Sequence, residues 1–271
     1  ELNLIAASYA ALVQGRPLPD LDLPGYFAAW EGVEPASASR EQARALEHWR
    51  QRLAAGGPLC AFGQQPLAAP PGPASRLDRA LTDAESSALS EMAQSLGISL
   101  PALLLAAYLL LLGRESGSDR PTCQTAMLGR RGPQQRQVLG AFAHAVPFSL
   151  DLAGVLTFAE LARQVAGQQR SDFRHGRLTT PEMIQAGLDP WQGGPPWGAA
   201  FSALDFSYDP GFPALSVSPT PLAVGPVPDV NLTVCAQQHR SGSGALTLAW
   251  SHNPERISSE QAARLAARYQ N

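Results

Sequence analysis

Histidine is the side chain best suited to proton transfer at neutral pH, and this chain of 271 residues carries five histidines. His48 lies on the outer side of a charged helical segment, and His175 and His239 lie in polar turns. We expect these three rings to be solvated. His252 follows the last predicted strand, where we expect local hydrogen bonds. These four histidines therefore indicate no catalytic role.

The fifth histidine, His144, lies in a strand pattern and shares the parity of Val146 and Phe148. That parity favours a hydrogen-bonded histidine in the core. The alternative is a histidine beside a bound substrate, where the ring would polarise a carbonyl group. Ser202 and Asp205 are polar residues in a later β-prone run, and they either face solvent or contact a substrate.

The remaining composition excludes several classes of protein. The sequence contains no nucleophile elbow, phosphate-binding loop, dinucleotide fingerprint or Cys-x-x-Cys pair. Its three cysteines (Cys60, Cys123 and Cys235) lack metal-ligand spacing, which predicts no metal site and a reduced, cytoplasmic compartment. A net charge of −3 gives no reason to expect nucleic acid or a membrane as partner. The apolar run 100–112 is shorter than the ~20 residues that span a bilayer, so we expect a buried helix.

Residues 122–152 organise the predicted fold. A short β-prone run from Thr122 to Met127 is followed by a polar break at residues 129–133. Residues 145–152 then alternate between apolar and polar types, the pattern of a strand with one buried face. Further strands are predicted at 76–81, 201–208, 231–237 and 245–251.

Helix signals alternate with these strands. Thr82 with Glu85, and Thr157 with Glu160, are predicted capping boxes, in which hydroxyl and carboxylate oxygens satisfy backbone amides at the helix start. Ser99 is the expected cap of the apolar helix. The alternation predicts an α/β (α+β) fold with a mixed sheet flanked by helices.

Composition also divides the chain. Residues 58–75 are rich in proline and glycine, which predicts an extended linker. Residues 1–57 are expected to be helical, whereas residues 76–271 carry all of the predicted strands. Because Glu1 already stands in a helical pattern, we expect the chain to belong to a longer protein.

The order of several segments resembles the condensation domain of nonribosomal peptide synthetases. That family has a strand ending in a Gly-Arg turn, and then a Gly-x-Phe-Val-Asn-Thr segment. The counterparts here are residues 127–130 (MLGR) and 140–145 (GAFAHA), with His144 and Ala145 in place of Asn-Thr. Three earlier family segments correspond to residues 8–12 (SYAAL), 24–30 (PGYFAAW) and 48–56 (HWRQRLAAG).

This resemblance implies a chloramphenicol-acetyltransferase-like fold of two lobes around a tunnel. Residues 1–57 would be the tail of the first lobe, and residues 76–271 the second lobe. The implied reaction is amide formation by acyl transfer from a carrier-protein thioester to an amine on a downstream carrier protein. It would serve antibiotic or siderophore biosynthesis in a bacterial cytoplasm. The partners would be upstream and downstream peptidyl carrier proteins, whose phosphopantetheine holds the substrates, with no cofactor or metal bound directly.

The family signature His-His-x-x-x-Asp-Gly does not occur in this sequence. The resemblance places the general-base histidine upstream of Glu1, so no catalytic residue is assigned and this chain alone would be inactive. Gly129, His144, Ser202 and Asp205 are the implied substrate-tunnel candidates. Ser202 and Asp205 stand where the family carries asparagine.

Two alternatives stay open. The substituted motifs are also expected of a degenerate, non-catalytic condensation-like domain that recruits carrier proteins or a tailoring enzyme. A relative that esterifies a hydroxyl acceptor would share the same segments. The residues upstream of Glu1 would separate the catalytic from the non-catalytic interpretation.

Overall fold

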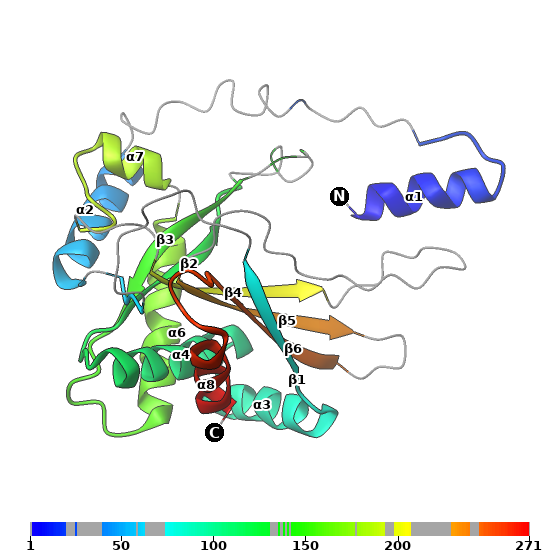
Figure 1. The fold of residues 1–271 in the computed structure, drawn as a ribbon. Coiled ribbons are helices and arrows are strands. Elements are labelled where there is room, and N and C mark those ends of the chain that lie inside the picture. The colour runs from blue at the N-terminus through cyan, green and yellow to red at the C-terminus, as the bar shows by residue number, and fades with distance from the viewer. Residues whose placement is uncertain are drawn as a thin grey trace.

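A computed structural model describes residues 2–19, 25, 40–57, 59–62, 74–130, 135, 138, 140, 142–176, 178–192, 198–206, 229–238 and 244–270. Apart from Gly25, the family-like segment 24–30 lies outside the described residues, as does His239. The helices and strands, drawn in Figure 1, are α1 (Leu2–Val13), α2 (Arg40–Ala55), β1 (Ser75–Ala80), α3 (Asp83–Leu96), α4 (Leu100–Ser116), β2 (Thr122–Leu128), β3 (Ala143–Ser149), α6 (Phe158–Arg174), α7 (Thr180–Gln185), β4 (Ala199–Phe206), β5 (Val230–Gln238), β6 (Gly244–His252) and α8 (Ser259–Gln270).

The strands form one mixed sheet in the order β1-β6-β5-β4-β2-β3. The inner strands β2, β4 and β5 run parallel to one another. β3 and β6 pair antiparallel with their neighbours, and β1 pairs antiparallel with β6. The predicted α/β class with a mixed sheet is confirmed, and each predicted strand exists with slightly shifted ends.

Local signals in the sequence account for the helix starts. Thr82 with Glu85, and Thr157 with Glu160, form the predicted capping boxes. Thr179 and Glu182 form another at the start of α7. Ser99 caps α4 as predicted, with Pro101 in the first turn, where a missing amide hydrogen costs nothing.

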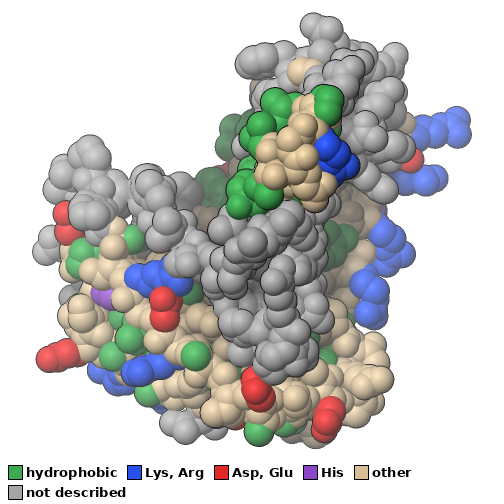
Figure 2. Space-filling view, turned by 90° about the vertical axis from the view of Figure 1, so that its right-hand side faces the viewer, with side chains coloured by type: hydrophobic (Ala, Val, Ile, Leu, Met, Phe, Trp, Pro, Cys, Tyr) green, Lys and Arg blue, Asp and Glu red, His purple; other side chains and the backbone are tan. Residues whose placement is uncertain are grey.

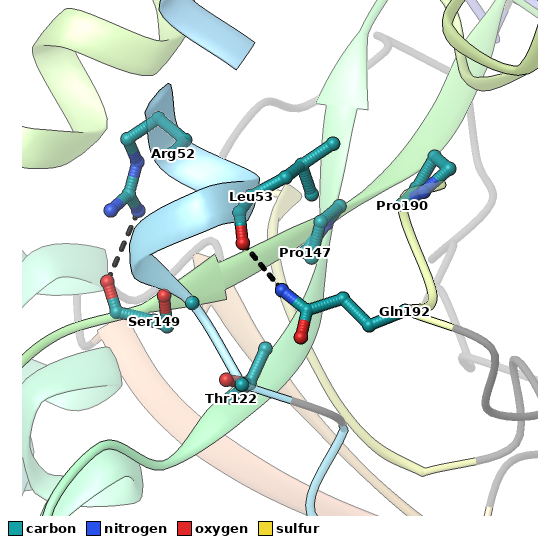
Figure 3. Close-up of a pocket in the computed structure, with 9 residues that line it drawn as sticks. Arg52, Leu53, Thr122, Pro147, Ser149, Pro190 and Gln192 are labelled. Atoms are coloured by element: carbon teal, nitrogen blue, oxygen red, sulfur yellow. Dashed lines mark hydrogen bonds between the residues drawn. The ribbon is translucent and has the colours of Figure 1, made fainter. Parts of the chain in front are cut away.

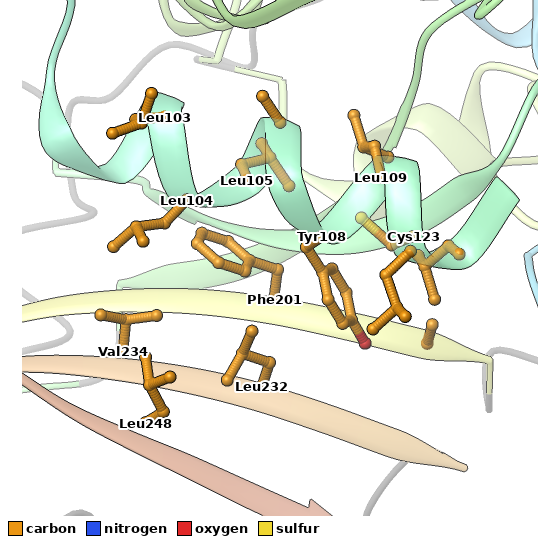
Figure 4. Packing of buried hydrophobic residues seen from close by; sticks show 14 of the residues in the cluster. Leu103, Leu104, Leu105, Tyr108, Leu109, Cys123, Phe201, Leu232, Val234 and Leu248 are labelled. Carbon is orange, nitrogen blue, oxygen red and sulfur yellow. The ribbon is translucent and has the colours of Figure 1, made fainter. Parts of the chain in front are cut away.

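Helix α4 is the centre of the core. Its buried side chains include Leu105, Tyr108 and Leu109, which are completely inaccessible to solvent. They pack on the strands beneath, against residues such as Phe201 and Leu232 (Figure 4). α6 and α8 cover the rest of α4. The apolar run 100–112 is therefore a buried helix, as predicted.

Helix α1 contrasts with α4, because its large apolar side chains are exposed. Ile5, Leu12 and Val13 have 57%, 64% and 57% of their surface accessible. The hydrophobic patch high in Figure 2 lies over this helix, which is drawn apart from the sheet in Figure 1. Among the described residues, nothing covers this apolar face.

Residues 59–62, in the range expected to be a linker, are hydrogen-bonded to the ends of two strands of the sheet. The Cys60 amide donates to the carbonyl of Thr122 at 2.8 Å, and the Ala199 amide donates to the carbonyl of Cys60 at 2.7 Å. Cys60 therefore lies between the first residues of β2 and β4. A Cβ at Gly198 would overlap Leu59, so this close approach requires glycine. Residues 63–73 lie outside the described residues.

A buried carboxylate joins α2 to α6. Asp172 is 2% exposed, and its Oδ1 lies 2.8 Å from His48 Nε2 and 3.2 Å from Arg52 Nε. Gln168 donates to the same oxygen at 2.8 Å. The prediction that His48 is solvated is wrong, because its ring is bound to the buried Asp172 carboxylate and only 14% of its side chain is exposed.

His175, also expected in solvent, is half-buried at the C-terminal end of α6. Its ring stacks on the ring of His48 with centroids 4.1 Å apart. The carbonyl of His175 accepts a hydrogen bond from Trp49 Nε1 at 3.1 Å. α2 is thus held by ionic, aromatic and hydrogen-bonded contacts.

His252 ends β6 and is only 3% exposed. Its ring nitrogens have no hydrogen-bond partner among the described residues, whereas the sequence suggested local hydrogen bonds. Burial lowers the pKa of His252, because the charged ring would lose its hydration.

Among the described residues, no single helix is both long and apolar enough to cross a bilayer. α3 and α4 meet the length and composition only as a pair, and that pair is bent by 99°.

Removing the Asp172 carboxylate should destabilise the fold strongly. Asp172→Ala leaves Arg52 and His48 without their buried partner, and breaking a buried ion pair costs about 3–5 kcal/mol. Chemical denaturation measures the change in the free energy of unfolding. The control is Asp78→Ala, which removes a half-exposed partner of Arg76 and should change stability little. Equal effects of the two variants would contradict a structural role for Asp172.

His252 should make the protein less stable in mild acid. A lowered folded-state pKa means that the unfolded chain takes up this proton at higher pH, so stability is lost as pH falls below about 6.5. His252→Gln cannot be protonated in this range and should show a smaller loss between about pH 7 and 5. Unfolding midpoints across this range test the prediction, and parallel pH profiles for both proteins would refute it.

Candidate functional site

The two faces of the sheet differ in chemistry, as the strand register shows. Phe201, Leu232 and Trp250 lie side by side on β4, β5 and β6 and are buried under α4. The next row along the same strands is Ala200, Asn231 and Ser251, which points to the opposite side. One face of the sheet is therefore apolar, and the other is polar.

We call the second side the polar face. It is defined by small and polar side chains that carry no formal charge: Gln124, Ala200, Ser202, Asn231, Thr233 and Ser251. In the described part of the chain, α3, α4 and α8 lie on the other side of the sheet (Figure 1). Asn231 donates to the Thr233 hydroxyl at 3.3 Å. On β2, β4, β5 and β6 the polar face offers hydrogen-bonding groups without fixed charge, and at the β1 edge its rows end in Arg76 and Asp78.

Gly129 and His144 lie together where β2 ends and β3 begins. The Gly129 amide donates to the carbonyl of Phe142 at 3.0 Å. A Cβ at Gly129 would overlap that carbonyl oxygen and come within 3.1 Å of His144 Nδ1. This position therefore requires glycine, and the half-buried His144 ring packs against it.

Arg130 holds the chain that follows this glycine. Its guanidinium donates to the carbonyls of Gln135 and Val138, the latter at 2.8 Å. It also lies over the Phe142 ring, 4.4 Å from the centroid, a cation–π distance. The Gly-Arg turn singled out in the sequence is thus a structural unit.

The structure does not bring all four candidates to one place. His144 pairs with Met127, on the side of Val146 and the small apolar cluster around Trp49. Ser202 pairs with Thr233 on the polar face and is half-buried. The backbone of Asp205 pairs with Ala236, and its side chain lies outside the described part of the chain. A role for each in substrate binding stays a prediction.

A pocket opens where α2 ends against β2 and β3 (Figure 3). Its cavity volume is about 10 Å³, room for roughly one water molecule. The lining includes Arg52, Gly56, Gly57, Thr122, Ser149 and Gln192. Thr122 and Ser149 are directly opposed across β2 and β3, on the same side of the sheet as Gln124. The pocket therefore lies at the β3 edge of the polar face.

Sequence reasoning missed this pocket, since its residues come from four separate segments. Thr122 was noted only as the start of a strand, Arg52 only as part of the family-like segment 48–56, and Ser149 and Gln192 carried no motif. The one available signal is the Gly56-Gly57 pair, which is also the ordinary signature of a helix end.

Among the described residues, the geometry supports neither a reactive cysteine thiolate nor a metal site. Burial raises the pKa of the Cys60 thiol and raises that of Cys123 further, so neither forms a reactive thiolate easily. Among the described residues, no group of three or more His, Cys, Asp or Glu side chains could hold a metal ion.

Comparison with known proteins shows the family to which this chain belongs. A model described as condensation domain matches residues 2–191. Chondramide synthase cmdD of Chondromyces crocatus is 29% identical over 189 residues, covering 66% of this chain and 5% of that protein. The dimodular nonribosomal peptide synthase of Bacillus subtilis (strain 168) is 23% identical over 253 residues, covering 93% of this chain and 10% of that protein.

Solved structures show the same fold. The starter condensation domain of rhizomide synthetase aligns with a TM-score of 0.81 and 22% identity, over 99% of this chain and 61% of that one. The first condensation domain of the calcium-dependent antibiotic synthetase aligns with a TM-score of 0.75 and 18% identity, over 99% of this chain and 59% of that one. This chain thus spans about three fifths of these structures and a small part of each synthetase. It belongs to the condensation-domain family of the nonribosomal peptide synthetases.

Proposed function

We propose that this chain forms part of a condensation domain that joins a donor acyl group to an acceptor amine as an amide. The relatives that support this proposal include synthases of linear gramicidin, tyrocidine and enterobactin. The donor would arrive as a thioester on an upstream carrier protein, and the amine on a downstream one. Both would be held on phosphopantetheine, with no cofactor bound by the chain itself, in the cytoplasm.

The polar face is the observation that carries this proposal. A sheet packed on one side usually leaves its other side to water, where charged residues are common. Here the central rows instead carry alanine, serine, threonine and amide side chains. Thr233 and Ser251 are only 8% and 3% exposed. Uncharged side chains of this kind would suit a neutral acyl or peptide chain that needs hydrogen bonds and close approach.

The proposed reaction involves an amine, a thioester and a base. The amine nitrogen forms a bond to the thioester carbonyl carbon, the carbon–sulfur bond breaks, and the donor thiol leaves. A base takes the proton from the amine, and the thiolate is protonated. We propose that the base is a histidine N-terminal to residue 1 of this sequence. Ser202 and its neighbours on the polar face would position the thioester, which accelerates the reaction by orientation.

The exposed face of α1 fits a two-lobed arrangement. Ile5, Leu12 and Val13 are each more than half exposed. We propose that residues 1–57 are the tail of the first lobe, and that these three side chains of the tail pack against the rest of that lobe. The second lobe would be residues 76–271, with the boundary in 58–75. α2 would then join this tail to the second lobe, because His48 and Arg52 bind the Asp172 carboxylate of α6.

A condensation assay tests the proposed reaction. The protein at its natural length is mixed with donor and acceptor that are loaded on their carrier proteins, and products are detected by mass spectrometry. We expect an amide on the acceptor carrier, and its loss when the histidine expected upstream of residue 1 is replaced. Carrier binding without product would reject amide synthesis and favour the recruitment platform. An ester product with a hydroxyl acceptor would reject the amine as acceptor.

We propose that His144 contributes to acceptor binding from the point where β2 ends and β3 begins, beside Gly129, on the side of Val146 and not on the polar face. His144→Ala is expected to raise the KM for the loaded acceptor carrier several-fold, the effect of losing about one hydrogen bond. His252→Gln is the control, since it changes a histidine on β6, several strands away from β3. An unchanged KM for His144→Ala would remove His144 from the substrate path.

A further inference from the structure

Two histidine rings are stacked at the junction of α2 and α6. The centroids of His48 and His175 lie 4.1 Å apart, and the angle between the ring planes is only 13°. Both residues are half-buried, and the ring of the fully buried Trp49 lies at 81° to that of His48. Histidine is the side chain that ordinarily changes its charge between pH 5 and 8. A stacked pair at a contact between two helices can therefore couple that contact to pH.

Each ring already uses one proton in a hydrogen bond. His48 Nε2 lies 2.8 Å from the Asp172 carboxylate, and His175 Nδ1 lies 2.9 Å from the carbonyl of Ser171. Both partners can only accept hydrogen bonds, so the two ring nitrogens are the donors. In the neutral pair, the other nitrogen of each ring carries a lone pair. Any further proton turns that ring into a cation.

The charged groups that face the pair are one cation and one anion. Arg52 of α2 donates to Asp172 of α6, and Gln168 adds a neutral amide to the same carboxylate. Asp172 thus accepts from three side chains at once. The other elements packed against α2 contribute apolar side chains to the cluster around Trp49, namely Val146, Leu178 and Met183.

Three more charged groups lie near the pair in the sequence or on α7, and each has its own contacts. Glu47 is exposed and accepts from two side chains of its own helix. Arg174 is exposed and donates to a carbonyl one turn earlier in α6. Glu182 accepts backbone and hydroxyl hydrogen bonds in the capping box of α7. The charge balance at the two rings therefore depends on Arg52 and Asp172.

Protonation changes this balance in two steps. With both rings neutral, the charges of Arg52 and Asp172 cancel. A first proton gives His48 a positive charge beside the carboxylate that it already contacts. A second proton on His175 places two cations 4.1 Å apart, with the same single carboxylate between them and Arg52. Like charges at this distance repel strongly, and the carbonyl end of α6 attracts a cation only weakly by comparison.

We propose that His48 and His175 form an acid-sensitive latch, which holds α2 on α6 while at least one ring is neutral and releases it when both are protonated. Release removes the repulsion, so protons favour the released state. The contact should therefore weaken as pH falls below about 6.5, where histidine ordinarily takes up its proton. The inference concerns how α2 is held, and it does not depend on the proposed reaction.

Hydrogen–deuterium exchange on the protein at its natural length measures this local opening. Protection factors of the α2 amides, corrected for the intrinsic exchange rate, are compared at about pH 7.5 and 5.5. We expect them to fall about tenfold or more, because the two charges repel at this distance. The amides of α4, in the centre of the core, should change less. An equal loss in both helices would show global unfolding and overturn the latch.

Two variants remove one charge each and keep neighbouring contacts. His175→Phe keeps a flat ring on His48 and the backbone carbonyl that accepts from Trp49. His48→Gln keeps an amide donor for Asp172. Either variant should hold the α2 protection factors nearly constant between the two pH values. The matched control is His252→Gln, which removes another buried histidine and should leave the α2 response as in the wild type.

Protection of α2 that does not change with pH in the wild type would overturn the proposal, as would an equal fall in the wild type and both latch variants. These measurements need no substrate. A failed condensation assay would reject the proposed reaction and leave the latch, whereas pH-independent protection would reject the latch and leave the reaction.

Discussion

Helix α4 is apolar on every side, so it has to be covered by the sheet on one side and by other helices on the others. That requirement fixes which residues of each strand are hydrophobic. Phe201, Leu232 and Trp250 face α4, and the alternate residues of the same strands form the polar face. The chemistry available to a substrate is thus a consequence of how the core is packed.

The edge of the sheet at β3 depends on a different contact. Asp172 binds His48 and Arg52, and through them it positions the C-terminal end of α2. Arg52 in turn donates to the carbonyl of Ser149, so the ion pair also shapes the pocket. A buried ion pair is weak evidence for stability, because its desolvation is costly. Its role here is to position α2, since it holds together two helices that are far apart in sequence.

Features with local causes were predictable from the sequence. The capping boxes at Thr82 and Thr157 and the β-strands follow from neighbouring residues and from periodicity. The position of Cys60 within the sheet was not predictable, because proline and glycine around it suggested a linker. His48 was misassigned for a similar reason, since its partner Asp172 lies more than a hundred residues away and nothing in α6 marks that carboxylate. The pocket likewise joins segments that only the fold brings together.

The central claim is that the polar face lines the path of the substrate, and site-directed cross-linking tests it most directly. Ser202→Cys places a thiol on this face, and Thr125→Cys places one on the apolar side. Each protein is mixed with a carrier protein whose phosphopantetheine carries a bromoacetyl group, so that a cysteine thiolate displaces bromide and forms a thioether. The account predicts that the carrier becomes attached at position 202 and not at position 125. No attachment at 202, or equal attachment at both positions, would contradict it.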